Sequence, residues 1–267
     1  MAKTFGFIGT GNMGSALARA AAKTLDPVSI ILHNRTMEKA KALAEELNCR
    51  YAMKDFIPQT SSYIFLGVKP QMMGDLLAEM APILAARTSR FILVSMAAGL
   101  TMADIRTMAG GDYPIIRIMP NTPVAVGEGV ILYDALDVTE EELNFFCKAL
   151  SAAGLLDHLP EPLFDAGMAI AGCGPAFADL FMEALIRGGV ANGLPKETAQ
   201  AYAIRMMQGA AKLALETGKD PAELRKAVCS PGGTTLAGID AMEQAGFSAA
   251  AEAAVHAAIQ RSKELRK

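Results

Sequence analysis

The chain has 267 residues, a formal net charge of -3 and 20% charged residues. This length allows two domains of ordinary size, each with its own hydrophobic core. The charge lacks the basic surplus of nucleic-acid-binding proteins, so we expect no nucleic-acid partner. The uncharged stretches 56–68 and 91–103 are too short to cross a bilayer, and we expect no membrane association. Met1-Ala2-Lys3 leads straight into a strand without a signal peptide, which predicts a cytoplasmic location.

The four cysteines form no recognisable ligand or disulfide pattern. None of them is in a Cys-x-x-Cys pair or beside clustered histidines: Cys49, Cys147, Cys173 and Cys229. We therefore expect buried thiols and no metal site.

The first pattern with chemical meaning is a strand, a glycine turn and a helix. An apolar strand at 4–8 runs into Gly9-Thr10-Gly11-Asn12-Met13-Gly14, and an alanine-rich helix follows from Ser15. The first glycine permits a tight turn, the second lets the backbone approach a diphosphate, and the third lets the helix pack on its strand. The predicted cofactor contacts here are Gly9, Thr10, Gly11, Asn12, Met13 and Gly14.

The loop after the second strand, 28–32, selects between the two nicotinamide dinucleotides. About 20 residues after the last glycine, NAD-binding chains carry an acidic residue that holds the ribose. This chain has Asn34, Arg35 and Thr36 there, which can bind a 2′-phosphate. We therefore favour NADPH, with NADH possible. The alternative is that Arg35 is a solvated surface residue, and we interpret His33 as a neighbour of the adenosine.

The following segments alternate between helix and strand. We predict helices at 37–47 and 72–84 and strands at 63–68 and 91–95, which form βαβ units of a doubly wound parallel sheet of the Rossmann type. Ligands collect at the carboxyl ends of such strands. The loops that follow the strands add further predicted cofactor contacts: Val68, Lys69, Pro70 and Ala97.

A strand at 115–119 then enters the proline-bounded loop Pro120-Asn121-Thr122-Pro123. The amide of Asn121 could orient a carboxamide or an imine, and we list it as a substrate contact. A simple turn residue is the alternative. A strand at 130–133, a helix from Thr139 and a last strand at 155–159 complete a first domain at 1–160.

From residue 161 the sequence is alanine-rich and helical, which defines a second, all-helical domain at 161–267. Helices are predicted at 174–186, 197–215, 222–228 and 249–265. The first two helices are apolar around most of their circumference. Together they have more apolar surface than one small domain can bury. We expect an obligate homodimer through this domain.

Near the end of the chain, Ser230-Pro231-Gly232-Gly233-Thr234-Thr235 opens a further helical pattern. Two glycines and hydroxyl side chains at a helix start leave backbone N–H groups free to bind a small carboxylate. An ordinary helix cap is the alternative.

Together these motifs resemble those of the pyrroline-5-carboxylate reductase family. The resemblance covers nearly the whole chain and rests on five ordered motifs. They are Gly9-x-Gly11-x-x-Gly14, Val68-Lys69-Pro70, Met119-Pro120-Asn121-Thr122-Pro123, Gly172-Cys173-Gly174-Pro175-Ala176 and Ser230-Pro231-Gly232-Gly233-Thr234-Thr235.

The resemblance implies a reaction and an assembly. NAD(P)H would donate hydride to the C=N carbon of 1-pyrroline-5-carboxylate, giving L-proline in the last step of proline biosynthesis. Ser230, Gly232, Gly233, Thr234 and Thr235 would bind the substrate, with the Thr235 hydroxyl as the catalytic contact to the ring nitrogen. Two protomers would interlock through the helical domain, with active sites at the dimer interface and decamers in some members.

Two other functions compete with this one. A β-hydroxyacid dehydrogenase would need a lysine at the glycine-rich helix start, but no lysine follows Gly174-Pro175 before Lys196. A non-enzymatic dimer that senses NADPH would keep the glycine turn but would need no carboxylate cradle. The loop at 230–235 therefore favours the reductase.

Overall fold

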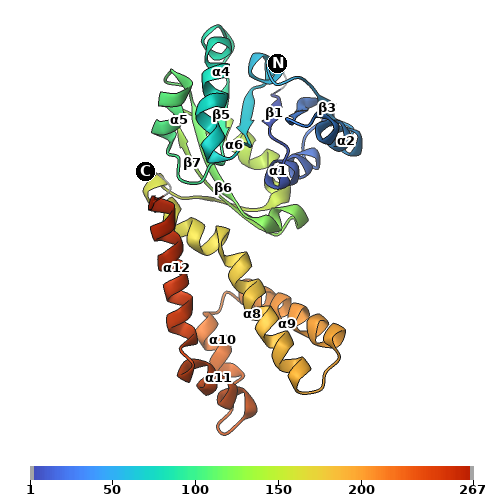
Figure 1. The fold of residues 1–267 in the computed structure, drawn as a ribbon, viewed down its shortest axis with the longest axis vertical. Coiled ribbons are helices and arrows are strands. Elements are labelled where there is room, and N and C mark those ends of the chain that lie inside the picture. Colours follow the sequence, from blue (N-terminus) through green and yellow to red (C-terminus); the bar gives the residue numbers. More distant parts are fainter. Residues whose placement is uncertain (1–2, 265–267) are drawn as a thin grey trace. The chain divides into compact units, whose positions relative to one another are not determined.

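The computed structural model describes residues 3–264, and its internal contacts divide the chain into two compact units (Figure 1). The first unit comprises Met1–Cys173 and Ala258–Lys267, and the second comprises Gly174–Ala257. The division falls later than the predicted boundary after residue 160, because the segment 161–173 packs on the sheet of the first unit. The return of the last helix to the first unit was not predicted.

The first unit is built on one eight-stranded sheet with the strand order β3-β2-β1-β4-β5-β6-β7-β8. The strands are β1 (Phe5–Ile8), β2 (Ile30–His33), β3 (Arg50–Tyr51), β4 (Tyr63–Leu66), β5 (Ile92–Ser95), β6 (Ile115–Pro120), β7 (Gly129–Leu136) and β8 (Gly154–His158). All pairs are parallel except β6 with β7. The doubly wound parallel sheet that we predicted is confirmed, and one edge pair is antiparallel because only a short 3₁₀ turn, η3 (Thr122–Val126), joins β6 to β7 and a turn of that length reverses the chain.

Helices cover both faces of the sheet. They are α1 (Asn12–Ala22), α2 (Met37–Leu47), α3 (Phe56–Thr60), α4 (Met73–Ala85), α5 (Met102–Ala109) and α6 (Glu140–Ala149). Alternate residues of β1 point to opposite faces: Phe5 and Phe7 pack with α1, α2 and α6, whereas Ile8 packs with α3, α4 and α5. The sequence analysis missed α3 and α5, although Thr101 and Asp104 form a capping box at the start of α5.

The second unit contains only helices, as predicted. They are α8 (Gly174–Ala191), α9 (Lys196–Thr217), α10 (Pro221–Ala227), α11 (Thr234–Gln244) and α12 (Phe247–Glu264), whose end lies in the first unit. The predicted last helix extended to Leu265, which lies outside the described residues. Phe181 of α8 packs on Phe247 of α12, with 5.5 Å between the ring centroids.

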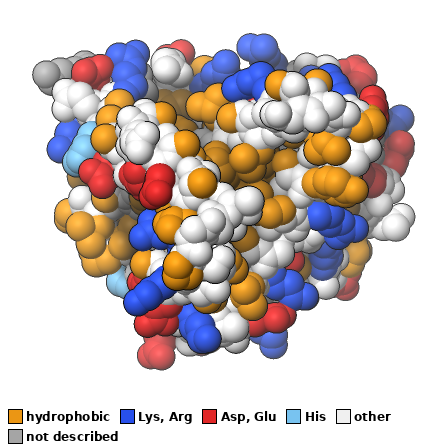
Figure 2. Space-filling view, turned by 90° about the horizontal axis from the view of Figure 1, so that it is seen from below, with side chains coloured by type: hydrophobic (Ala, Val, Ile, Leu, Met, Phe, Trp, Pro, Cys, Tyr) orange, Lys and Arg blue, Asp and Glu red, His pale blue; other side chains and the backbone are white. Residues whose placement is uncertain are grey.

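This unit has almost no core of its own within one chain. Ala199 and Ala203 are its only buried residues, and all of 174–257 is described. Figure 2 shows a face of the chain on which hydrophobic side chains lie between charged ones. The large apolar side chains exposed in this unit include Leu180, Tyr202, Ile204, Met206, Leu213, Leu215 and Val228. Such a surface needs a partner to cover it.

Within residues 3–264, one helical run is long and apolar enough to cross a membrane by length and composition alone. This run, Glu161–Ala191, has a window with a mean hydropathy of 1.5, of which 6% is buried. The sequence analysis did not identify it, because charged residues interrupt the run. The same exposed apolar surface is what packing against a second copy of the chain requires.

A buried ion pair fastens the segment that leaves the sheet for the second unit. Arg117 of β6 is 1% exposed and donates to the Glu161 carboxylate at 2.8 Å. The same carboxylate accepts a hydrogen bond from the backbone N–H of Met102 at 2.8 Å. The guanidinium also lies 4.6 Å from the ring centroid of Phe164. Glu161 is therefore the counter-charge that makes burial of Arg117 tolerable.

Glu161→Ala should destabilise the protein strongly, because it leaves a guanidinium buried without a counter-charge. We expect a loss of about 3–5 kcal/mol, measured as a fall in the thermal unfolding midpoint at fixed protein concentration. Glu141→Ala is the matched control, since its pair with Lys3 is exposed and should contribute about 0–1 kcal/mol. Equal shifts for the two variants would contradict the assignment.

Candidate cofactor and substrate sites

The glycine turn has the geometry that a diphosphate site requires. Gly9 has a φ of +103°, and a Cβ there would lie 2.4 Å from the carbonyl oxygen of Gly67. A Cβ on Gly14 would lie 2.2 Å from the carbonyl oxygen of Gly9. A Cβ on Gly11 would meet no atom within 4 Å, so the open side of the turn is at Gly11. Gly11 is also the N-cap of α1 and makes no side-chain capping bond, which leaves the helix start available to an anion.

Gly67 directly follows β4 and was not among the residues predicted to contact the cofactor. A Cβ at this position would lie 2.4 Å from the carbonyl oxygen of Gly9, so the loop after β4 and the glycine turn both require glycine. The available signal was a glycine directly after a buried strand. These close approaches bring the loops after β1 and β4 together at the carboxyl edge of the sheet.

The loop after β2 lies beside the glycine turn and presents one free cation. The amide of Asn34 donates to the Thr10 hydroxyl at 3.0 Å and accepts from the backbone N–H of Thr36 at 3.0 Å. Asn34 therefore binds protein groups at both ends of its amide. Arg35 is exposed and has no hydrogen bond or ion pair with any other residue in 3–264. Its guanidinium is the group in this loop best suited to a phosphate.

The other predicted cofactor contacts differ in exposure. Lys69 is exposed and precedes the 3₁₀ turn η2 (Pro70–Met72), and Val68 is half-buried. Ala97 is 2% exposed with its side chain in the core beside α4 and α5. A contact between Ala97 and a cofactor would therefore use its backbone.

Asn121 is buried, and its amide is engaged at both ends. Its Nδ2 donates to the carbonyl oxygen of Ala171 at 3.0 Å, and its Oδ1 accepts from the N–H of Val130 at 2.9 Å. The side chain is 7% exposed. These contacts favour the alternative of a residue that shapes the turn, and the predicted contact with the substrate stays a prediction.

The predicted substrate loop lies in the second unit and opens α11. Gly232 has a φ of +70°, and the N–H of Gly233 donates to the carbonyl oxygen of Ser230 at 3.0 Å. A Cβ on Gly233 would lie 2.5 Å from the Ser230 hydroxyl, which would have to rotate away, and the positive φ of Gly232 favours glycine in this turn. Gly233 caps α11 without a side-chain hydrogen bond, and Thr234 and Thr235 are exposed. The loop thus repeats the design of the first site: a glycine-bounded helix start with its N–H groups available.

The large pKa shifts lie away from the glycine turn. Hydrogen bonds from Arg90 lower the pKa of Glu142 to about 2, and burial raises the pKa of Tyr63. Tyr63 pairs with Phe5 at the amino ends of their strands, whereas the glycine turn follows the carboxyl end of β1. Groups with shifted pKa values often mark active sites. Here the shifted groups lie at the opposite edge of the sheet from the glycine turn, so we assign these shifts to structural contacts.

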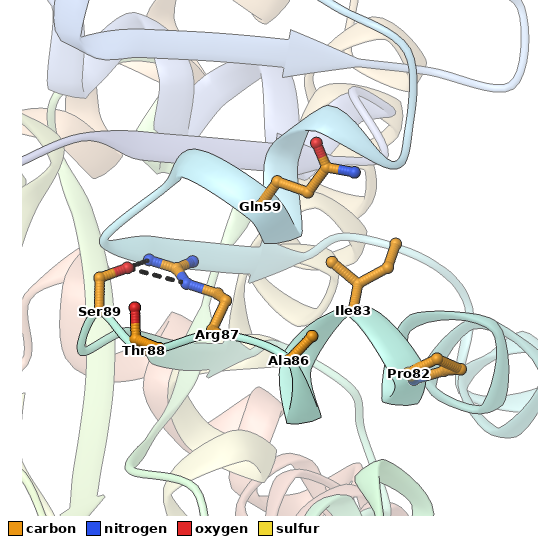
Figure 3. A pocket seen from close by; sticks show the side chains of 7 residues that line it. All are labelled: Gln59, Pro82, Ile83, Ala86, Arg87, Thr88 and Ser89. Atoms are coloured by element: carbon orange, nitrogen blue, oxygen red, sulfur yellow. Dashed lines mark hydrogen bonds between the residues drawn. The ribbon is translucent and has the colours of Figure 1, made fainter.

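A hollow also lies at the amino edge of the sheet. It measures about 520 Å³ and lies between the ends of α3 and α4 and the turn before β5 (Figure 3). Arg87 in its wall donates to the carbonyl oxygens of Pro58 and Ser61 at 2.8 and 2.7 Å, and to the Ser89 hydroxyl at 3.0 Å. The Arg87 guanidinium therefore caps the carbonyl groups at the end of α3 and is not free to bind a ligand. None of the predicted site residues lines this hollow.

Comparison with known proteins places this geometry in a family. The family model described as pyrroline-5-carboxylate reductase dimerisation matches residues 161–265, and the model described as NADP oxidoreductase, coenzyme F420-dependent, matches residues 4–99. The pyrroline-5-carboxylate reductase of Pisum sativum is 36% identical over 98% of this chain and 96% of its own length. That of Escherichia coli is 34% identical over the whole of both chains.

Solved structures agree along the full chain. A pyrroline-5-carboxylate reductase from Coxiella burnetii has a TM-score of 0.90 at 32% identity, covering 99% of both chains. A pyrroline carboxylate reductase from Plasmodium falciparum, solved with NADP bound, has a TM-score of 0.88 at 28% identity and covers 99% of this chain and 98% of that one. The motifs, the two-unit fold and these end-to-end matches show that the chain belongs to the pyrroline-5-carboxylate reductase family.

Proposed function

We propose that this chain catalyses the reaction that its family name describes, the NAD(P)H-dependent reduction of 1-pyrroline-5-carboxylate to L-proline. The observation that carries the proposal is the pair of glycine-bounded helix starts, at Asn12 and Thr234, neither of which has a side-chain cap. One suits a diphosphate and the other a small carboxylate. Loss of reduced-nicotinamide absorbance on addition of 1-pyrroline-5-carboxylate tests the proposal. Tight NADPH binding without turnover would favour the sensing dimer instead.

The residues at the carboxyl edge of the sheet fit a dinucleotide. Gly9, Gly11 and Gly14 shape the turn for the diphosphate, and Arg35 is the candidate for a 2′-phosphate, which favours NADPH over NADH. Lys69, exposed in the loop after β4, adds a second positive charge at the carboxyl edge of the sheet. When bound, the cofactor supplies the hydride.

In the second unit, the helix start at 230–235 would hold the substrate carboxylate. The backbone N–H groups at Thr234 and Thr235 offer hydrogen bonds, and the exposed Thr235 hydroxyl is the candidate contact to the ring nitrogen. An imine accepts hydride readily once its nitrogen is protonated, so the protein needs positioning and one polar partner more than a strong acid. This agrees with the sequence of the loop, because none of the side chains at 230–235 is an acid or a base at neutral pH.

The apolar surface of the second unit supports a homodimer as the functional form. Tyr202, Met206 and Leu213 are exposed and lie on one face of α9, because four and seven residues separate them. A second copy is the partner that the family's dimerisation model suggests. Assembly of dimers into a decamer and a cytoplasmic location are further parts of the proposal.

Arg35→Asp should weaken NADPH binding far more than NADH binding. We expect an NADPH loss of about 2–3 kcal/mol, or roughly 30- to 150-fold in Kd, from the lost charge-assisted hydrogen bonds and the new repulsion. Fluorescence titration of both cofactors measures the ratio. Lys41→Asp, which makes the same charge change further along α2, should leave the ratio unchanged, and equal losses for both cofactors in Arg35→Asp would exclude this role.

Thr235→Ala should lower kcat by about one to three powers of ten, the scale of losing one active-site donor. Thr235→Ser keeps the hydroxyl and should retain most of the turnover. Steady-state assays of the two variants, with NADPH affinity as a check of the cofactor site, measure the difference. Unchanged turnover in Thr235→Ala would remove it from the reaction.

Leu213→Asp should dissociate the dimer, because it places a charge in the apolar face of α9 that we assign to the interface. Lys212→Asp is the neighbouring control, since Lys212 is exposed and pairs with Glu216. Light scattering after gel filtration should give a dimer mass for the native chain and the control. A monomeric native chain would contradict the proposed assembly.

A further inference from the structure

The segment that enters the second unit contains a π-helical turn. This turn, η6 (Met168–Gly172), follows α7 (Phe164–Gly167) and precedes α8, and the N–H of Cys173 donates to the carbonyl oxygen of Met168 at 2.9 Å. In a regular α-helix, the carbonyl of Ala171 would accept from the N–H of residue 175. Residue 175 is proline and has no N–H, so the helix cannot supply that donor.

Asn121 supplies the donor that Pro175 lacks. Its Nδ2 lies 3.0 Å from the Ala171 carbonyl oxygen, while its Oδ1 accepts from the N–H of Val130. Since one partner can only accept and the other can only donate, the orientation of the amide is fixed. The backbone N–H of Asn121 also donates to the Val130 carbonyl oxygen at 3.2 Å. The amide is thus held rigidly against β7.

Packing holds the same segment to the sheet. A small core of Met119, Leu132 and Phe164 includes Ala171, as well as Ala98 from the loop after β5. A Cβ on Gly167 would lie 2.5 Å from Leu132, so the segment lies close on β7. Asn121 provides the last hydrogen bond from the sheet to this segment before the contact division after Cys173.

We propose that Asn121 is a positioning residue, which holds the Ala171 carbonyl in place of the missing Pro175 N–H and so fixes the chain at its entry into the second unit. The inference rests on the proposed function, which draws its cofactor contacts from the first unit and its substrate loop from the second. Loss of this hydrogen bond loosens the link between those two sets of residues. The effect falls on turnover, since small misplacements of reacting groups cost much rate, and leaves the cofactor residues of the first unit in place.

A double-mutant cycle with Pro175→Ala tests this role. Asn121→Ala should lower kcat about tenfold or more and change the Kd of NADPH by less than about twofold. Pro175→Ala restores an N–H that can donate to Ala171, so in that background Asn121→Ala should cost about threefold or less. Asn121→Asp, which has the same size and keeps the acceptor for Val130, should lose turnover as Asn121→Ala does.

Equal losses in both backgrounds, or full turnover in Asn121→Asp, would overturn the proposal. If Asn121→Ala fails to fold alone, recovery of a folded protein in the double variant becomes the supporting result, and failure of both is the contrary one. Thermal midpoints of the four proteins give the same cycle without turnover. A native chain that lacks turnover would overturn the proposed reaction, and the midpoints would then decide whether Asn121 holds Ala171.

Discussion

The cofactor site depends on a close approach of backbone segments in the first unit. Gly9, Gly14 and Gly67 leave no room for a Cβ between the turn after β1, the start of α1 and the loop after β4. Three elements therefore converge at the carboxyl edge of the sheet, and the uncapped start of α1 lies among them. Any side chain at these positions would push the loops apart and so displace the backbone N–H groups that can reach an anion.

Much of this edge could be predicted from sequence, because glycine spacing encodes backbone geometry directly. The roles of Gly9 and Gly14 and the start of α2 follow from local pattern alone. The antiparallel direction of β7 and the presence of helix α5 could not be predicted in this way. A strand's direction depends on the length of the turn before it, and the short helix α5 has a weak apolar period although its Thr101 cap was visible. Arg117 and Glu161 are far apart in sequence, so no local sequence pattern predicts that they form a buried ion pair.

The second unit shows why composition alone is ambiguous about partners. The run Glu161–Ala191 satisfies the length and hydropathy of a membrane span, yet charged side chains interrupt it. The next helix, α9, carries the exposed side chains of Arg205 and Lys212. With two buried alanines in the whole unit, one chain gains little apolar burial from folding these helices. The stability of this unit must come from surface buried in an assembly, and a dimerisation match over 161–265 agrees with that requirement.

Two of the three asparagines that we predicted as ligand contacts show how short polar side chains behave beside proline and glycine loops. Asn34 joins the glycine turn to the start of α2, and Asn121 joins β7 to a helix that proline has deprived of a donor. Both amides satisfy protein groups first, because a buried backbone group without a partner costs free energy at all times, whereas a ligand is present only when bound. In the function that we propose, recognition uses groups that folding leaves without partners: the N–H groups of two helix starts, the guanidinium of Arg35 and the Thr235 hydroxyl. A site of this kind needs a rigid scaffold more than it needs many functional side chains, since backbone N–H groups can be aimed only by fixing the backbone itself.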